Sequence, residues 1–268
     1  LRNNDTIEKL ERFIQALAQE GSEEFELLDE YAVTKTQEGI FFETLSHPDS
    51  TIYNIPTLLK LDSAIELPKL KEAITAAVNA HPYLMTEFFI NKNGEIRQRR
   101  TDRVFAAGEI EDIRCASIDD IQDELVKPFD LQKDSLFRFK LITTGDGGYL
   151  FFDIHHVVFD GESKKIFLRD VTAAYNGTAP EAETFSGYEA AVVEEKLRAG
   201  VHYNASKEYY TKLLDGVESD CVPLGDILSE GQPQDGGMLN LSGKQAIPAV
   251  IGDYCKAHSV SENAFCTA

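Results

Sequence analysis

Two adjacent histidines followed by an aspartate–glycine pair are the residues of this sequence best placed to do chemistry. His155 and His156 come directly after the apolar run Tyr149–Ile154, and Asp160 and Gly161 follow after three intervening residues. Adjacent side chains at the end of a strand point in opposite directions, so one histidine faces a cleft and the other packs behind it. An imidazole changes charge near neutral pH. The cleft-facing histidine can therefore take or hold a proton from an amine or an alcohol.

The aspartate and the glycine have structural explanations. Asp160 follows His156 by four residues across a turn, where it can pair with a cation or with backbone N–H groups. Gly161 permits a backbone angle or a close approach that a Cβ forbids. A plain alternative is that both histidines are satisfied core residues beside an aromatic strand. A metal site is disfavoured, because the side chains of adjacent histidines diverge.

The sequence gives weaker support to the other candidate sites. Cys255 and His258 lie three residues apart on a predicted helix, but no second pair of ligands accompanies them, which argues against a zinc site. The glycine-rich turn at 145–148 lacks the Lys-Ser/Thr of a phosphate loop. The cysteines are too few and too scattered for a disulfide framework; they are Cys115, Cys221, Cys255 and Cys266.

The charge of the chain disfavours one class of partner. Among 268 residues, 26 are Lys or Arg and 46 are Asp or Glu, which gives a formal net charge of −20. An anionic surface repels phosphates, and the basic run 97–103 is better explained as the charged edge of a strand. No apolar run approaches the roughly 20 residues that cross a bilayer. We expect no nucleic-acid partner, no membrane contact, no metal and a cytoplasmic location.

Helical and strand patterns alternate along the chain, which predicts an α/β (α+β) fold with a mixed sheet. Helices are predicted at 5–19, 34–45, 68–80, 117–126, 162–175, 186–198, 204–215 and 247–258. Strands are predicted at 55–61, 83–90, 95–100, 135–143, 149–154 and 238–242. Turns at 91–94 and 145–148 predict two hairpins. The second hairpin places the strand that ends at the histidines beside 135–143.

The segment His155–Gly161 resembles the HHxxxDG motif of the condensation domains of nonribosomal peptide synthetases, within the chloramphenicol-acetyltransferase-like superfamily. Other segments agree in order along the chain. They are 34–41 with Gln37 for the first motif, 81–88 with His81, Leu84, Thr86 and Phe88 for the second, 128–138 with Leu136 and Arg138 for the P-F-D-L segment, and, more weakly, Tyr188 for a later aromatic motif.

This resemblance implies a two-lobed sandwich with the active site in a tunnel between the lobes. We expect residues 1–30 to form an N-terminal helix and linker, or the end of a preceding carrier domain. Residues 31–179 are expected to form a complete N-terminal lobe, and 180–268 to begin a C-terminal lobe that is truncated here. A fragment with half of the tunnel is expected to be inactive alone.

The resemblance also implies a reaction. An upstream carrier domain presents an acyl or peptidyl thioester on phosphopantetheine, and the amine of a downstream carrier-bound aminoacyl thioester attacks it. His156 is assigned to this step, as a general base or as a positioning group, while His155, Asp160 and Gly161 support it. No cofactor is expected to bind directly, and both carrier domains are expected in the same polypeptide. The alternatives are an epimerisation domain, another HHxxxDG acyltransferase and a non-catalytic docking module.

One departure from the family pattern concerns Asp160. The second motif of the family carries an arginine where this chain has Met85, and that arginine is expected to pair with the motif aspartate. Arg138 lies on the strand predicted to run beside 149–154. We therefore predict an Arg138–Asp160 ion pair as the substitute.

Overall fold

The structure is a computed structural model that describes residues 25, 27–217, 249–261 and 264–265. Two compact units divide the chain, residues 1–213 and residues 214–268. The second contains α8 (Ala249–His258), which confirms the helix predicted near the end of the chain. The predicted helix at 5–19 and the predicted strand at 238–242 lie outside the described residues. The predicted domain boundaries at 30 and 179 stay predictions.

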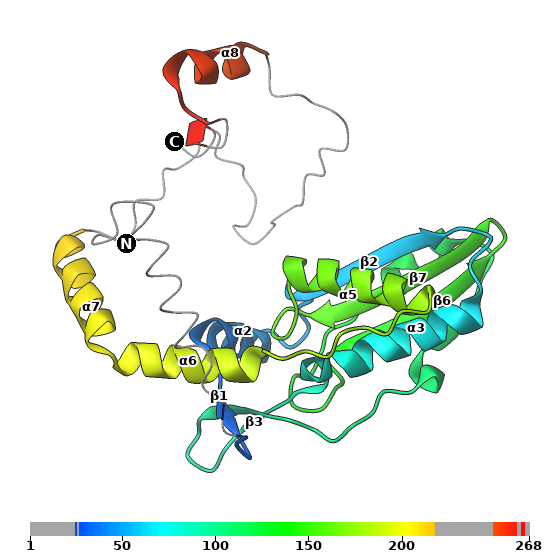
Figure 1. Cartoon of the computed structure of the whole chain (residues 1–268), viewed down its shortest axis with the longest axis horizontal. Coiled ribbons are helices and arrows are strands. Elements are labelled where there is room, and N and C mark those ends of the chain that lie inside the picture. Colours follow the sequence, from blue (N-terminus) through cyan, green and yellow to red (C-terminus); the bar gives the residue numbers. More distant parts are fainter. Residues whose placement is uncertain (1–24, 26, 218–248, 262–263, 266–268) are drawn as a thin grey trace. The chain divides into compact units, whose positions relative to one another are not determined.

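A four-stranded mixed sheet is the larger of the two sheets described in the first unit (Figure 1). Its order is β2-β7-β6-β5, and its strands are β2 (Asn54–Leu61), β5 (Glu111–Arg114), β6 (Phe137–Thr144) and β7 (Gly147–His155). β7 pairs antiparallel with both of its neighbours, and β5 runs parallel to β6. The predicted β6–β7 hairpin is confirmed. β5 was not predicted, because it is short, charged and exposed at three of its four positions.

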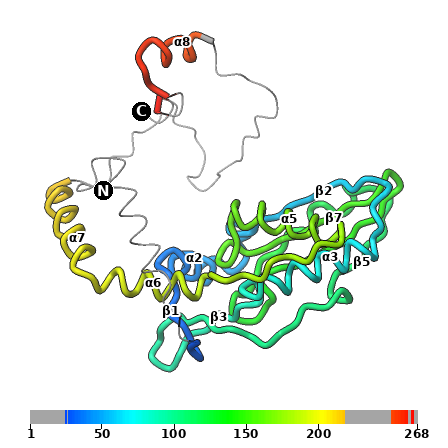
Figure 2. The backbone as a smooth tube through the Cα atoms, viewed as in Figure 1, coloured from blue at the N-terminus to red at the C-terminus, as the bar shows by residue number. Residues whose placement is uncertain are grey.

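Apolar side chains cover both faces of β7, which explains its nearly continuous hydrophobic sequence. Leu150, Phe152 and Ile154 belong to the main core, which they share with α3 (Leu67–Ala80) and α5 (Gly161–Tyr175). Alternate residues, including Phe151, pack in a second apolar cluster. Figure 2 shows α3 and α5 side by side along the sheet, and the chain passing from β7 into α5 through a short loop. The paired histidines stand where this loop begins: His155 ends β7 and His156 follows it.

A smaller sheet has the order β1-β4-β3. Its strands are β1 (Tyr31–Ala32), β3 (Glu87–Ile90) and β4 (Ile96–Arg99), and the predicted turn at 91–94 is confirmed by a Gly94 φ of 79°. The strand predicted from residue 83 begins later, because Pro82–Met85 forms the 3-10 turn η1. α2 (Lys35–Ser46) starts at a Thr34 capping box.

The remaining helices of the first unit differ from their predictions in extent. α6 (Gly187–Ala199) matches, whereas α7 (Val201–Leu213) begins and ends earlier than 204–215. The acidic helix predicted at 117–126 is two short pieces, η3 (Ile118–Asp120) and α4 (Gln122–Leu125), because Ile121 between them has a φ of −128°. Of the helices described, none combines the length and the apolar character needed to cross a bilayer.

Candidate active site

The two histidines at the junction of β7 and the loop to α5 lie in different environments. β7 ends at His155, whose N–H donates to the Leu136 carbonyl at 2.8 Å. The next N–H, that of His156, donates to the Tyr53 carbonyl at 2.8 Å. His155 is 2% exposed, whereas His156 is exposed. The structure thus places one histidine behind the strand end and the other at the surface, as the alternation predicted.

His155 is a packed, neutral group. Its ring meets the edge of Phe129 at a centroid distance of 5.7 Å and lies 6.3 Å from Tyr53. Its Nδ1 accepts the Val157 N–H at 3.2 Å, so the proton of the neutral ring sits on Nε2. Burial, together with the neighbouring His156, lowers the pKa of His155 to about 4. It therefore supports the loop and exchanges no proton near neutral pH.

Asp160 caps the helix that follows the loop. Its Oδ1 accepts the Ser163 N–H at 2.8 Å and the Ser163 hydroxyl at 2.7 Å. These bonds, with a smaller contribution from the charge of nearby His156, hold the pKa of Asp160 below its usual range. Of the two roles considered for Asp160, the structure shows pairing with a backbone N–H. The side chain satisfies an orphan donor in the first turn of α5.

The explanation predicted for Gly161 is wrong. Gly161 has no positive φ, and a Cβ built on it would meet no described atom within 4 Å. It is simply the first residue of α5. Nothing in the local packing requires glycine here.

The predicted ion pair between Arg138 and Asp160 is also wrong. Arg138 lies directly opposite Asp153 in the β6–β7 register, and its Nε is 3.9 Å from the Asp153 carboxylate. Asp160 lies beyond the end of β7, out of reach of that pairing, and has no ion pair among the described residues. The Arg138 guanidinium instead lies 3.8 Å from the centre of the Phe129 ring. The Phe129 ring packs in turn against His155, so Arg138 supports His155 indirectly.

Asp153 shares this region with Arg138. Asn54 donates to its Oδ2 at 2.6 Å, but its buried Oδ1 has no hydrogen-bond partner among the described residues. Burial raises the pKa of Asp153, and burial lowers the pKa of Arg138. The sequence analysis predicted no role for Asp153, because its neighbours in the strand are apolar. A carboxylate within an apolar strand is the sequence feature that could have indicated a role.

Gln37 of the first motif bonds to the histidine loop, and His81 of the second bonds to α5. Gln37, from the first turn of α2, donates from Nε2 to the Val157 carbonyl at 3.0 Å. His81 lies 2.7 Å from Asp170 of α5. Met85, where the resemblance implies an arginine, is buried. The other quoted positions Leu84, Thr86, Phe88 and Leu136 are buried as well.

A cavity of about 400 Å³ is lined by residues of the loop, of α5 and of the start of α6. Val158 and Phe159 of the loop contribute to its wall, together with Tyr83 and Glu183. Burial raises the pKa of Glu183. His156 is not among the lining residues, so the cavity and the exposed imidazole are separate features.

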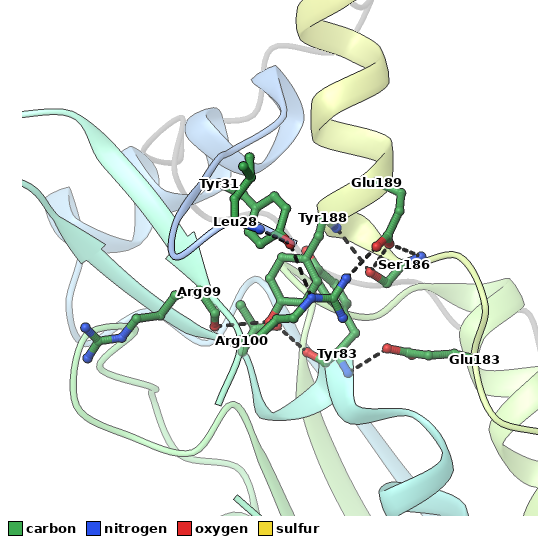
Figure 3. A network of polar contacts seen from close by, with 10 residues as sticks. Leu28, Tyr31, Tyr83, Arg99, Arg100, Glu183, Ser186, Tyr188 and Glu189 are labelled. Carbon is green, nitrogen blue, oxygen red and sulfur yellow. Dashed lines mark hydrogen bonds and ion pairs between the residues drawn. The ribbon is translucent and has the colours of Figure 1, made fainter. Parts of the chain in front are cut away.

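Figure 3 shows a polar network that the sequence did not predict. Tyr188 of α6 packs against Tyr31 and Tyr83, each with ring centroids 4.8 Å apart. Arg100 stacks on the Tyr188 ring at 4.3 Å and pairs with Glu189. Arginines of the run 97–103 are thus bound to carboxylates of their own chain. No group of three or more metal-ligating side chains gathers in the described part of the chain.

Comparison with known proteins places this geometry in a family. The model of the condensation domain matches residues 28–266. The chain belongs to the condensation domain family. Surfactin synthase subunit 1 from Bacillus subtilis (strain 168) is 29% identical over 195 residues, which are 70% of this chain and 5% of that protein. Tyrocidine synthase 3 from Brevibacillus parabrevis is 26% identical over 207 residues, 75% of this chain and 3% of that protein.

Solved condensation domains share the fold. The starter condensation domain of rhizomide synthetase RzmA superposes with a TM-score of 0.61 at 19% identity, covering 71% of this chain and 49% of that chain. The first condensation domain of the CDA synthetase gives 0.57 at 20% identity, covering 71% and 51%. This condensation domain sequence therefore spans about half the length of the solved structures it matches. The predicted chloramphenicol-acetyltransferase-like α/β fold is confirmed.

Proposed function

We propose that this chain contributes the catalytic histidine to a peptide-bond-forming condensation reaction. The exposed His156, standing at the end of β7 with its neutral neighbour His155 packed behind it, is the observation that carries the proposal. Family membership supplies the class of reaction. The substrates are an acyl or peptidyl thioester on one carrier domain and an aminoacyl thioester on another, both held by phosphopantetheine.

The reaction needs one proton to leave the attacking amine. As the C–N bond forms and the C–S bond breaks, that proton is lost and the departing thiolate gains one. The His156 imidazole can accept the proton or hold the amine by a hydrogen bond, because its ring is exposed rather than committed to a hydrogen bond among the described residues. Holding two tethered thioesters together supplies much of the remaining acceleration.

The other predicted site residues act on His156 indirectly. Arg138 supports Phe129, which supports His155, and His155 accepts the N–H of Val157 next to His156. Asp160 places the first turn of α5. These groups hold the loop in which His156 stands.

The test is a condensation assay with loaded carriers. It uses the native polypeptide that carries this chain, with upstream and downstream carriers bearing acyl and aminoacyl groups, and follows the dipeptidyl thioester by mass. His156→Ala should lower the rate by about 100-fold or more, because a positioned acid–base group typically contributes that much. His47→Ala is the matched control, since His47 is an exposed histidine at the end of α2 whose ring pairs with Glu43.

Two outcomes contradict the proposal. Condensation by His156→Ala at the wild-type rate would show that His156 takes no part in the reaction. Absence of product from the wild type with several donor–acceptor pairs would show that condensation is not the reaction. A test for exchange of the substrate α-proton would then examine epimerisation.

A further inference from the structure

We infer that Tyr83 and Gln98, together with Gln37, form a hydrogen-bonded ring that positions the loop carrying His156. The inference rests on the proposed function, because it takes His156 as the group that meets substrate. Its physical part, the control of the loop by the ring, stands on the contacts below. Tyr83 and Gln98 belong to none of the matched motif positions.

Three side chains from three elements close the ring. The Gln37 Nε2 of α2 donates to the Tyr83 hydroxyl of η1 at 2.6 Å. That hydroxyl donates to the Gln98 Oε1 of β4 at 2.8 Å. The Gln98 Nε2 returns a longer bond to the Gln37 Oε1 at 3.4 Å. Every member therefore both donates and accepts within the ring.

Backbone groups fix the direction of these bonds. The Thr34 N–H donates to the Gln37 Oε1 at 3.0 Å, and the Gln98 Nε2 donates to the Ala32 carbonyl at 2.8 Å. Neither amide can flip without setting two donors or two acceptors against each other. Burial raises the pKa of Tyr83, so its hydroxyl keeps the proton that it donates. Gln98 is fully buried, where an unmade hydrogen bond is costly.

The ring acts on the loop at one atom. The second proton of the Gln37 Nε2 goes to the Val157 carbonyl at 3.0 Å, one residue after His156. On the preceding side, the N–H of His156 is held by the Tyr53 carbonyl. The His156 imidazole makes no hydrogen bond of its own to any described residue, so its backbone sets its position. The ring supplies the side-chain anchor of the Val157 carbonyl, beside the bond that the Val157 N–H makes to His155.

Packing holds Tyr83 in the ring. Gly187, the first residue of α6, lies against it, and a Cβ there would overlap the Tyr83 hydroxyl. The Tyr188 ring contacts the Tyr83 ring edge-on. Tyr83 is thus held between α6 and the two glutamines, and loss of its hydroxyl removes a hydrogen-bond partner from both Gln37 and Gln98.

Tyr83→Phe tests the ring, because it deletes one hydroxyl and keeps the aromatic packing. Tyr188→Phe is the matched control. Its hydroxyl is also buried and bonded, to Thr86 at 2.6 Å and to the Arg99 carbonyl at 3.1 Å, but it takes no part in the ring. Both variants are compared in the native polypeptide that carries this chain. The readouts are hydrogen exchange of the amides at 156–158 and the separate kcat and KM values for loaded carriers.

Tyr83→Phe should speed amide exchange in the loop and lower kcat about tenfold with KM unchanged, since small misplacements of a catalytic group are costly. Tyr188→Phe should change neither. Gln98→Met opens the ring at a second point, and combining it with Tyr83→Phe should add little further loss. Equal losses in the two tyrosine variants, or unchanged loop exchange in Tyr83→Phe, would overturn the inference. If the wild type forms no dipeptide, the proposed function fails and loop exchange alone decides the role of the ring.

Discussion

At the scale of single residues, the difference between the two histidines comes from their burial. A proton on the Nδ1 of His155 would charge a group that is 2% exposed and would break its hydrogen bond from the Val157 N–H. His156, the next residue, is exposed. Burial therefore distinguishes two chain neighbours with the same side chain, and this supports the proposal that His156 rather than His155 meets substrate.

This difference predicts a pH dependence of stability. The pKa of His155 falls from 6.5 when unfolded to about 4 when folded, so the unfolded chain binds the proton more tightly. The stabilisation is present above pH 6.5 and is lost as the pH falls toward 4, by about 3 kcal/mol at most. Denaturant unfolding of the wild type between about pH 7 and pH 4 measures it.

The comparison for that experiment is His155→Asn, which keeps a polar atom near Nδ1 but does not titrate. Asp153 and Glu183, whose pKa values burial raises, change stability in the opposite direction in both proteins. The difference between wild type and variant therefore isolates His155. Equal slopes in the two proteins would show that His155 is not the titrating group.

Asp160 is predicted to act as a helix cap more than as a charge. Asp160→Ala removes the acceptor of the Ser163 N–H and should lower the free energy of unfolding by about 1 kcal/mol. Asp160→Asn keeps a capping oxygen and should cost only a small part of that. Chemical denaturation of both variants decides the point. A loss in Asp160→Asn as large as in Asp160→Ala would instead assign the effect to the negative charge.

At the scale of elements, the sequence predicted what depends on local pattern. The turn at 91–94, the β6–β7 hairpin and α5 follow from turn residues and periodicity. The separation of buried His155 from exposed His156 follows from alternation along a strand. β5 was missed because it has one apolar residue, and its place as a parallel edge strand is set by pairing with β6.

Partners distant in the chain were not predictable from that pattern. The sequence places Arg138 on the strand beside β7 but does not state the register, and the register sets it opposite Asp153 instead of Asp160. The same limit hid the ring, whose members Gln37 and Gln98 are 61 residues apart. A resemblance identifies motif residues, whereas a residue such as Tyr83 becomes visible only when three elements meet.

At the scale of the whole molecule, burial is distributed unevenly over the first unit. Much of the main core comes from the sheet, α3 and α5, and Val157, Val158 and Phe159 of the histidine loop belong to the same core. α7 has no buried residue, and several of its apolar side chains are exposed, among them Val201, Tyr209, Tyr210 and Leu213. A helix of 13 residues gains little from its backbone hydrogen bonds alone, because nucleation offsets them. Stability should therefore fall from the sheet toward α7.

Hydrogen exchange of this chain tests that gradient. Amides of α7 should exchange through local opening with a free energy near zero. Amides of α3, which buries five residues in the main core, should exchange only when that core opens. Peptides covering 201–213 should exchange orders of magnitude faster than peptides covering 67–80. The two helices have nearly the same length, 13 and 14 residues, so length does not explain the difference. Equal protection would mean that α7 is covered by a surface in solution, and comparison at two protein concentrations would show whether that surface belongs to a second copy.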